Sequence, residues 1–408
     1  MLIASRQSRE STIRFSPLVS AISGGGAAAW AVHSEAVRQH AAGRDITFLS
    51  VGDPDQRAPQ CIIEATETAL RAGETGYSAI VGLPQVRAAI AARVARRTGQ
   101  DCTADNIAIV PGAQAAVFAA LQCLAGPGDE VIAPEPMYAT YEAVARAAGA
   151  HVVNVPMRPE AGFRFDLTDL ERAVTPATRL IWINSPHNPT GVVLTRAEME
   201  AVAQICRRYD LWLLSDEVYE DIAYAAPHVS AWGLPVARGR TVVASSLSKS
   251  HAMPGYRMGW LAGPPELVAH LHNLILAMFY GSPRFVQLGA MPALTADLPE
   301  VASLRADYAR RASMVHDILS QASNCRSNPP QGGMFALLDV RGTGLGSDGF
   351  ARLLLEKKAI AVVPCDGFGP SGYGQLRISL TLDDARLADA AHRIVDLALD
   401  LTGPQAGS

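Results

Sequence analysis

Short apolar runs alternate with longer amphipathic segments through the middle of the chain. The runs are rich in β-branched and aromatic residues and predict strands, whereas the segments between them have the apolar spacing of helices. The predicted strands lie at 106–110, 130–134, 151–155, 179–184, 211–216, 241–246 and 258–263. The predicted helices lie at 115–124, 138–148 and 166–174, and a further one begins at Thr195 with Glu198 as its capping-box partner.

This pattern predicts the fold class. Strands that are apolar on both faces and alternate with helices indicate an α/β fold with a mostly parallel central sheet flanked by helices. After about Met291 the chain turns helical, and "GGMFALLDV" (332–340), a helix near Phe350–Lys358 and "GQLRISL" (374–380) then predict a smaller α+β domain. The expected parts are an N-terminal arm with part of the small domain at 1–50, a large cofactor domain at 51–290 and a small C-terminal domain at 291–408.

Composition narrows the function classes. The chain has 408 residues, of which 49% are hydrophobic and 18% charged, enough for one large or two ordinary domains. A net charge of −4 and the lack of a long basic stretch argue against a nucleic-acid partner. No apolar run reaches membrane-spanning length and the first twelve residues lack a signal-peptide core, so we expect a cytoplasmic protein without a membrane partner. The cysteines have no metal-binding spacing and are expected to be reduced thiols: Cys61, Cys102, Cys123, Cys206, Cys325 and Cys365.

Candidate chemistry follows the predicted strands, where open α/β sheets bind ligands. Asp216 ends one strand, as a cap or as the partner of a cation. Lys249 follows another strand, and its amine becomes a nucleophile if desolvation or nearby cations keep it neutral. Arg257 carries a donor fork suited to phosphate. A lysine for a Schiff base, an arginine for a phosphate and a carboxylate for a pyridinium nitrogen are the parts that pyridoxal phosphate requires.

Two further segments fit this cofactor. Gly112 closes a strand, and the helix that begins near Ala113 would point free N–H groups at a phosphate. In "NSPHNPTG" (184–191), two prolines favour an extended loop from which Asn188 can donate to a phenolate oxygen, and Tyr219 could share that oxygen. A single asparagine in a proline-rich turn is more often explained by turn chemistry.

Six stretches together resemble the class I/II aminotransferases of pyridoxal-phosphate fold type I, in family order. They are "GAQAA" (112–116), "PMYATY" (136–141), "NSPHNPTG" (184–191), "SDEVYEDI" (215–222), "SLSKSHAMPGYRMGW" (246–260) and "GQLRISL" (374–380). The resemblance extends from about Ser23 to the last helix. It implies a pyridoxal-phosphate-dependent transaminase, acting on an amino acid and a 2-oxo acid as a homodimer with shared active sites.

The resemblance also implies roles for individual residues. The catalytic residues are Lys249, which binds the cofactor and carries protons, Asp216, which pairs with the pyridinium nitrogen, and Tyr219. The other cofactor-binding residues are Asn188 at the ring hydroxyl, Tyr138 against the ring, Ala113, Gln114, Ser246 and Arg257 at the phosphate, and Tyr77 at the partner subunit's phosphate. The substrate-binding residues are Arg377 at the α-carboxylate, the backbone of Gly52, Asn188 and Trp30. The segment around Ser282 approaches the neighbouring subunit, and His251 has no assigned role.

The substrate prediction rests on further stretches that resemble arginine–pyruvate transaminases, including "GGGAAAW" (24–30), "LSVGDPD" (49–55) and "YGSPRF" (280–285). They imply an aminotransferase for arginine or a related basic or guanidino amino acid, in catabolism or in the biosynthesis of an unusual guanidino amino acid. Trp30 could stack on a guanidinium, and Glu10 or Asp53 could accept its hydrogen bonds. Arg284 and Gly24 depart from the arginine enzymes, which carry acidic residues there. A cation at Arg284 would favour a dicarboxylic substrate.

Parts of the sequence also match other functions. Ser246–Lys249 matches the S-x-x-K acyl-transfer signature, but no K-T-G follows it. "RGTGLG" (341–346) lacks the spacing of a dinucleotide loop. A non-catalytic sensor module of a transcription regulator would need a basic DNA-binding domain. An aspartate, glutamate or aromatic aminotransferase, or a lyase, decarboxylase or oxidase on the same scaffold, stays open.

Overall fold

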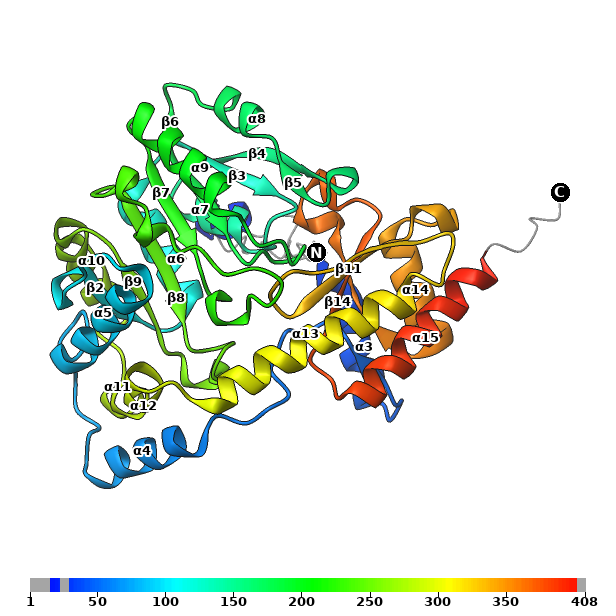
Figure 1. Ribbon diagram of the computed structural model, residues 1–408, viewed down its shortest axis with the longest axis horizontal. Coiled ribbons are helices and arrows are strands. Elements are labelled where there is room, and N and C mark those ends of the chain that lie inside the picture. Colours follow the sequence, from blue (N-terminus) through cyan, green and yellow to red (C-terminus); the bar gives the residue numbers. More distant parts are fainter. Residues whose placement is uncertain (1–14, 23–28, 402–408) are drawn as a thin grey trace, which may run out of the picture.

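The computed structural model describes residues 15–22 and 29–401, and its largest element is an eight-stranded sheet (Figure 1). In spatial order the strands are β2 (Ile107–Val110), β9 (Gly259–Ala262), β8 (Thr241–Ser246), β7 (Trp212–Asp216), β6 (Thr178–Asn184), β3 (Glu130–Glu135), β4 (His151–Arg158) and β5 (Arg164–Phe165). Strands β3, β4, β6, β7 and β8 are parallel. Strand β9 is antiparallel to β2 and β8, and β5 is antiparallel to β4. The mostly parallel sheet expected from the sequence is confirmed.

Helices cover both faces of this sheet because alternate residues of each strand point to opposite sides. Ile181 and Ile183 of β6 belong to one apolar core, and Leu180 and Trp182 belong to another. On the Ile181 side lie α5 (Pro84–Thr98), α8 (Leu167–Arg172) and α9 (Arg196–Arg208). On the Trp182 side lie α6 (Ala113–Leu124), α7 (Tyr141–Ala147) and α10 (Pro265–Met278). Further helices pack around the sheet: α1 (Pro17–Ala21) against α7, and α4 (Gln60–Arg71), α11 (Arg284–Gly289) and α12 (Met291–Thr295) against one another.

Of two helix starts predicted from the sequence, one is confirmed and the other lies three residues later than expected. The capping box at the start of α9 is present, with Thr195 N donating to Glu198 Oε2 at 2.7 Å. The helix expected from residue 138 begins only at Tyr141. The preceding segment is held outside the helix because Met137 N donates to Phe368 O at 2.7 Å.

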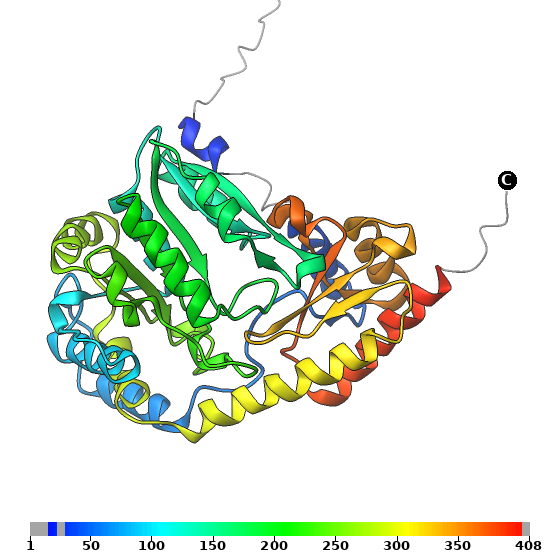
Figure 2. The same cartoon turned by 45° about the horizontal axis from the view of Figure 1, so that its top comes forward.

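A second unit contains a four-stranded antiparallel sheet in the order β10 (Arg326–Asn328), β11 (Phe335–Asp339), β14 (Gln375–Ser379) and β13 (Val363–Pro364). It also contains α3 (Ala31–Ala41), α13 (Pro299–Leu319), α14 (Ser347–Lys358), α15 (Asp384–Asp400) and the two-stranded pair of β1 (Thr47–Phe48) with β12 (Ile360–Ala361). Its core combines buried residues from 32–49 with residues from 304–398. Figure 2 shows α13, in yellow, running beneath both units and connecting them.

The carboxyl ends of β6, β7 and β8 face the second unit. Asn184 is in register with Asp216, and Asp216 is in register with Ala244, so these strands end side by side. Arg377 is buried on β14 and lies across from them. Within residues 15–22 and 29–401, no helix combines the length and apolar character needed to cross a membrane.

Candidate active site

A cavity of about 190 Å³ lies at the carboxyl ends of the parallel strands. The start of α6 and the loops after β6, β7 and β8 form its wall. Nine residues predicted from the sequence line it: Ala113, Gln114, Tyr138, Asn188, Asp216, Tyr219, Ser246, Lys249 and Arg257. These residues come from five separate stretches of the chain, and the fold brings them to one place.

Asp216 supplies a buried carboxylate at one end of the cavity. Its Oδ2 accepts a 2.6 Å hydrogen bond from the Tyr141 hydroxyl, and its Oδ1 accepts one of 3.1 Å from Val218 N. Both donors are neutral. Burial raises the pKa of Asp216 to about 6, although these two hydrogen bonds lower it. A buried carboxylate of this kind is stabilised by a cationic partner, and a protonated ring nitrogen meets that requirement.

Lys249 lies three residues beyond the end of β8. Its Nζ donates to the carbonyl oxygen of Gly52 at 2.6 Å. Burial lowers the pKa of Lys249 to about 8, and Arg377 and Arg257 lower it as well, while Asp53 opposes them. The amine is therefore far more often neutral near neutral pH than an exposed lysine, as nucleophilic attack on a carbonyl requires.

The opposite end of the cavity is suited to an anion. Arg257 has a left-handed backbone (φ 54°) and donates to the carbonyls of Pro254 at 2.8 Å and Pro111 at 2.9 Å. Gly112 has a φ of 83°, a conformation that favours glycine, and a side chain there would force the Arg257 guanidinium to shift. The first N–H groups of α6 have no carbonyl partner within the helix and point to the same place. Together with the Ser246 hydroxyl, these donors fit a phosphate group.

Asn188 and Tyr219 lie between the two ends. Asn188 Nδ2 donates to the Tyr219 hydroxyl at 3.3 Å, and Asn188 Oδ1 accepts from Arg377 Nη1 at 3.2 Å. The backbone N–H of Asn188 donates to Asn184 Oδ1 at 2.7 Å, which fixes the loop on the end of β6. The amide is thus oriented by its neighbours on both sides.

Arg377 is a fully buried cation. Its Nη2 donates to Ser50 O at 2.9 Å, and its guanidinium carbon lies 4.1 Å from the ring centre of Phe335 and 5.8 Å from that of Trp30. Its Nε has no hydrogen-bond partner within the described parts of the chain. The unused donor leaves capacity for a carboxylate, the group that a guanidinium fork binds best. Trp30 thus contacts the arginine that was predicted to bind the substrate's α-carboxylate.

The remaining candidate residues do not line this cavity. Tyr77 is 81% exposed, and its ring centre lies 4.9 Å from that of Tyr280. Ser282 O accepts a hydrogen bond from Ser78 Oγ close by. Glu10 and Gly24 lie outside the described residues. His251 is buried, and burial lowers its pKa to about 4.

The sequence interpretation did not identify Tyr141. Its ring stacks on Trp182 with centres 3.7 Å apart, and its hydroxyl holds Asp216. The stretch "PMYATY" contained the signal, since Tyr141 lies three residues after Tyr138 and the two rings meet edge to face. Its hydrogen-bond partner Asp216, however, lies 75 residues later in the sequence.

Comparisons with known proteins show which family this chain resembles. Residues 44–394 match the family described as aminotransferase class I and II. The chain is 46% identical over 391 residues to the arginine–pyruvate transaminase AruH of Pseudomonas aeruginosa, covering 96% of this chain and 100% of that protein. It is 32% identical over 353 residues to an aspartate aminotransferase of Pyrococcus horikoshii, covering 86% of this chain and 90% of the relative.

Solved structures of aminotransferases have the same architecture. The aspartate aminotransferase from Thermus thermophilus with maleate superposes with a TM-score of 0.89 at 30% identity, covering 94% of this chain and all of the other. The aromatic aminotransferase from Pyrococcus horikoshii gives a TM-score of 0.83 at 33% identity, covering 86% of this chain and 95% of the other. The expectation of fold type I is confirmed, and this chain belongs to the aminotransferases of class I and II.

Proposed function

We propose that this aminotransferase uses pyridoxal phosphate to move the amino group of arginine, or of a related guanidino amino acid, to a small 2-oxo acid such as pyruvate. The observation that carries the cofactor is the arrangement of Asp216, Lys249 and Arg257 along one cavity. Support for the substrate comes from the 46% identity to an arginine–pyruvate transaminase over that protein's whole length, against 32% for an aspartate enzyme.

Each residue then has a task. Bound pyridoxal phosphate supplies an aldehyde and a ring that accepts electrons. Asp216 would hold the ring nitrogen in its protonated form, and Asn188 and Tyr219 would donate to the ring oxygen. Lys249 offers a neutral amine and can carry a proton on Nζ. Arg377 would bind the substrate's α-carboxylate and orient the Cα–H bond.

The position of Arg284 bears on the substrate. Its guanidinium forms an ion pair of 2.5 Å with Glu74, so its charge is balanced within the chain. A balanced Arg284 offers less attraction to a second substrate carboxylate than a free cation would. Asp53, exposed beside Gly52, exerts its charge on Lys249 and is a candidate acceptor for a guanidinium.

We expect arginine to be the preferred amino donor. Steady-state kcat/KM should be measured for arginine, ornithine, aspartate, glutamate and phenylalanine, each with pyruvate and with 2-oxoglutarate. Arginine should lead aspartate, glutamate and phenylalanine by at least about tenfold, a difference of about 1.4 kcal/mol. Omitting the 2-oxo acid should stop turnover after the cofactor is converted to its amine form, and adding it back should restore the aldehyde form. A tenfold lead for aspartate or phenylalanine overturns the arginine assignment and leaves the aminotransferase assignment intact.

Tyr141→Phe should lower kcat/KM by about tenfold, because it removes the hydrogen bond to the Asp216 carboxylate. A hydrogen bond to a charged group contributes roughly 1.5–3 kcal/mol. The Tyr141 hydroxyl lowers the pKa of Asp216, so its loss should raise that pKa. Activity should then fall at a higher pH as the solution is acidified, because Asp216 must be ionised. The measurement is kcat/KM against pH. Tyr308→Phe is the control, since its buried hydroxyl has no partner among the described residues, and an unchanged pH profile in Tyr141→Phe would contradict the role.

We further propose a homodimer in which Tyr77 reaches the partner's phosphate site, and a cytoplasmic location, given six free thiols. Subunits carrying Tyr77→Phe should be mixed with subunits carrying Lys249→Ala. Hybrid dimers should regain activity, because one of their two sites then carries neither change. Mixing Lys249→Ala with Asp216→Ala is the control and should give no gain, since both residues belong to the same chain's site. Equal results from the two mixtures would rule out a shared site.

A further inference from the structure

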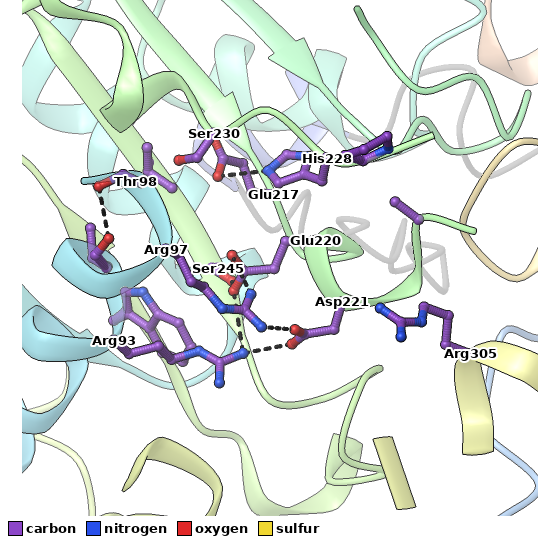
Figure 3. Close-up of a pocket in the computed structure, with 15 residues that line it drawn as sticks. Arg93, Arg97, Thr98, Glu217, Glu220, Asp221, His228, Ser230, Ser245 and Arg305 are labelled. Carbon is purple, nitrogen blue, oxygen red and sulfur yellow. Dashed lines mark hydrogen bonds and ion pairs between the residues drawn. The ribbon is translucent and has the colours of Figure 1, made fainter. Parts of the chain in front are cut away.

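A second cavity, of about 290 Å³, lies behind the loop that follows β7 (Figure 3). The chain divides its side chains between the two cavities. Asp216 and Tyr219 line the active site, whereas Glu217, Glu220 and Asp221 line the second cavity. Strand β8 alternates in the same way, with Ser246 in the first cavity and Ser245 in the second. Glu217 and Ser245 of the second cavity are therefore direct neighbours in sequence of Asp216 and Ser246 of the active site. The two cavities share no lining residue.

Ion pairs cross this cavity. Arg93 pairs with Asp221 at 2.6 Å, Arg97 pairs with Glu220 at 3.1 Å and with Asp221, and His228 Nε2 lies 3.0 Å from Glu217 Oε2. Arg305 extends from α13 toward Asp221, as Figure 3 shows. The lining thus contains three arginines and three carboxylates, together with His228. Burial lowers the pKa of His228, but the neighbouring Glu217 carboxylate opposes it and the net pKa lies above its ordinary value. The three arginines and three carboxylates balance one another, and a proton on His228 would add one positive charge.

The groups left without partners are nitrogen atoms. Arg93 Nε and His228 Nδ1 have no hydrogen-bond partner among the residues described, although their side chains are only 5% and 9% exposed. Arg305, which is exposed, forms no ion pair within the described chain. Arg93 Nε always carries a hydrogen, and so does Nδ1 of a protonated His228. A buried donor without an acceptor costs about 1–3 kcal/mol, so an acceptor in this cavity would stabilise the fold.

The same lining could be considered for a metal ion. Glu217, Glu220 and His228 can bring one ligand atom each within 4.8 Å of one another. Arg97, however, already holds Glu220, and a protonated His228 cannot coordinate a metal. The unpaired Nε of Arg93 and the guanidinium of Arg305 can only donate hydrogen bonds, which favours an acceptor such as an anion over a metal cation.

We propose that this second cavity is a binding site for a small oxyanion, either a carboxylate or inorganic phosphate. An occupant would accept hydrogen bonds from Arg93, His228 and Arg305 and balance the positive charge. The cavity is large enough for several water molecules or for an anion of four to six heavy atoms. The site is separate from the substrate site, so it stands whichever amino acid the enzyme prefers.

The test is thermal unfolding of the protein loaded with pyridoxal phosphate, so that the phosphate end of the active site is filled. Sodium phosphate and sodium acetate are titrated separately against sodium chloride at equal ionic strength and pH. A ligand that binds the folded state raises Tm in a saturable way. We expect at least one anion to raise Tm above the chloride value, and the one that does identifies the source. A Tm that follows chloride for both anions overturns the site.

Variants separate this cavity from the active site, where acetate could bind Arg377. Arg305→Gln and His228→Gln should each weaken the anion's apparent affinity by at least about fivefold, while Arg386→Gln, an exposed arginine on α15, should leave it unchanged. Crystals soaked in selenate should show an anomalous peak between Arg305 and His228. A peak there with wild-type titrations in both variants marks an adventitious ion only and overturns the proposal, as does a peak confined to Arg377.

Discussion

Lys249→Ala should abolish transamination, lowering kcat by at least about 10⁴-fold, because one substitution removes both the nucleophile and the proton carrier. Borohydride reduction of the wild-type protein should leave a pyridoxyl group on Lys249. Peptide mapping can identify it without ambiguity, since the chain has only two other lysines, Lys357 and Lys358. Both of these lie in the last turn of α14.

Lys357→Ala is the matched control, with full activity and an unchanged label. A label on Lys357 or Lys358, or near-normal turnover by Lys249→Ala, would overturn the cofactor assignment.

The lowered pKa of Lys249 gives a further readout. Since Lys249 titrates at about 8, reconstitution of the cofactor-free protein with pyridoxal phosphate should accelerate as pH rises to 8 and level off above it. An ordinary lysine would show this rise near its usual pKa of about 10.4.

Asp216→Ala should retain the fold and much of the cofactor but lower kcat by at least about a hundredfold, comparable to the loss of a positioned electrostatic group. Without the carboxylate the ring nitrogen is less often protonated and accepts electrons less well. The measurements are kcat with the best substrate and the absorbance of bound cofactor. A cofactor analogue methylated on the ring nitrogen carries a permanent charge and should restore part of the lost rate.

The alternative is that Asp216 is a cap at the end of a strand. Asp166 tests this, because it caps α8 by accepting from Thr168 N at 2.7 Å. Asp166→Ala should cost about 1 kcal/mol of stability and leave kcat unchanged. If Asp216→Ala behaves in the same way, Asp216 has no role in catalysis.

The sequence predicted those site residues whose position depends on a nearby strand. Asp216 and Lys249 follow apolar runs, and the end of a parallel strand is a defined place in the fold. The directions of β9 and β5 were not predictable, because a short apolar run carries no information about which neighbour it pairs with.

Contacts between distant segments could not be derived from local patterns either. Tyr141 and Asp216 are 75 residues apart, and Arg377 and Asn188 are 189 apart. Arg284 pairs with Glu74 across 210 residues, so the sequence alone could not show that its charge is balanced within the chain. The role proposed for Tyr77 could not be derived from local patterns either, since it requires a second copy of the chain.

The amide of Asn188 has a consequence for how the enzyme distinguishes substrate from cofactor. Asn188 Oδ1 accepts a hydrogen bond from Arg377, so only Nδ2 of the amide is available on the other side, where it donates to the Tyr219 hydroxyl. An aspartate of the same shape would offer two acceptors, neutralise Arg377 and repel the incoming α-carboxylate. If substrate and pyridoxal phosphate bind as proposed, the one amide of Asn188 would connect the arginine that binds the α-carboxylate with the tyrosine that donates to the ring oxygen.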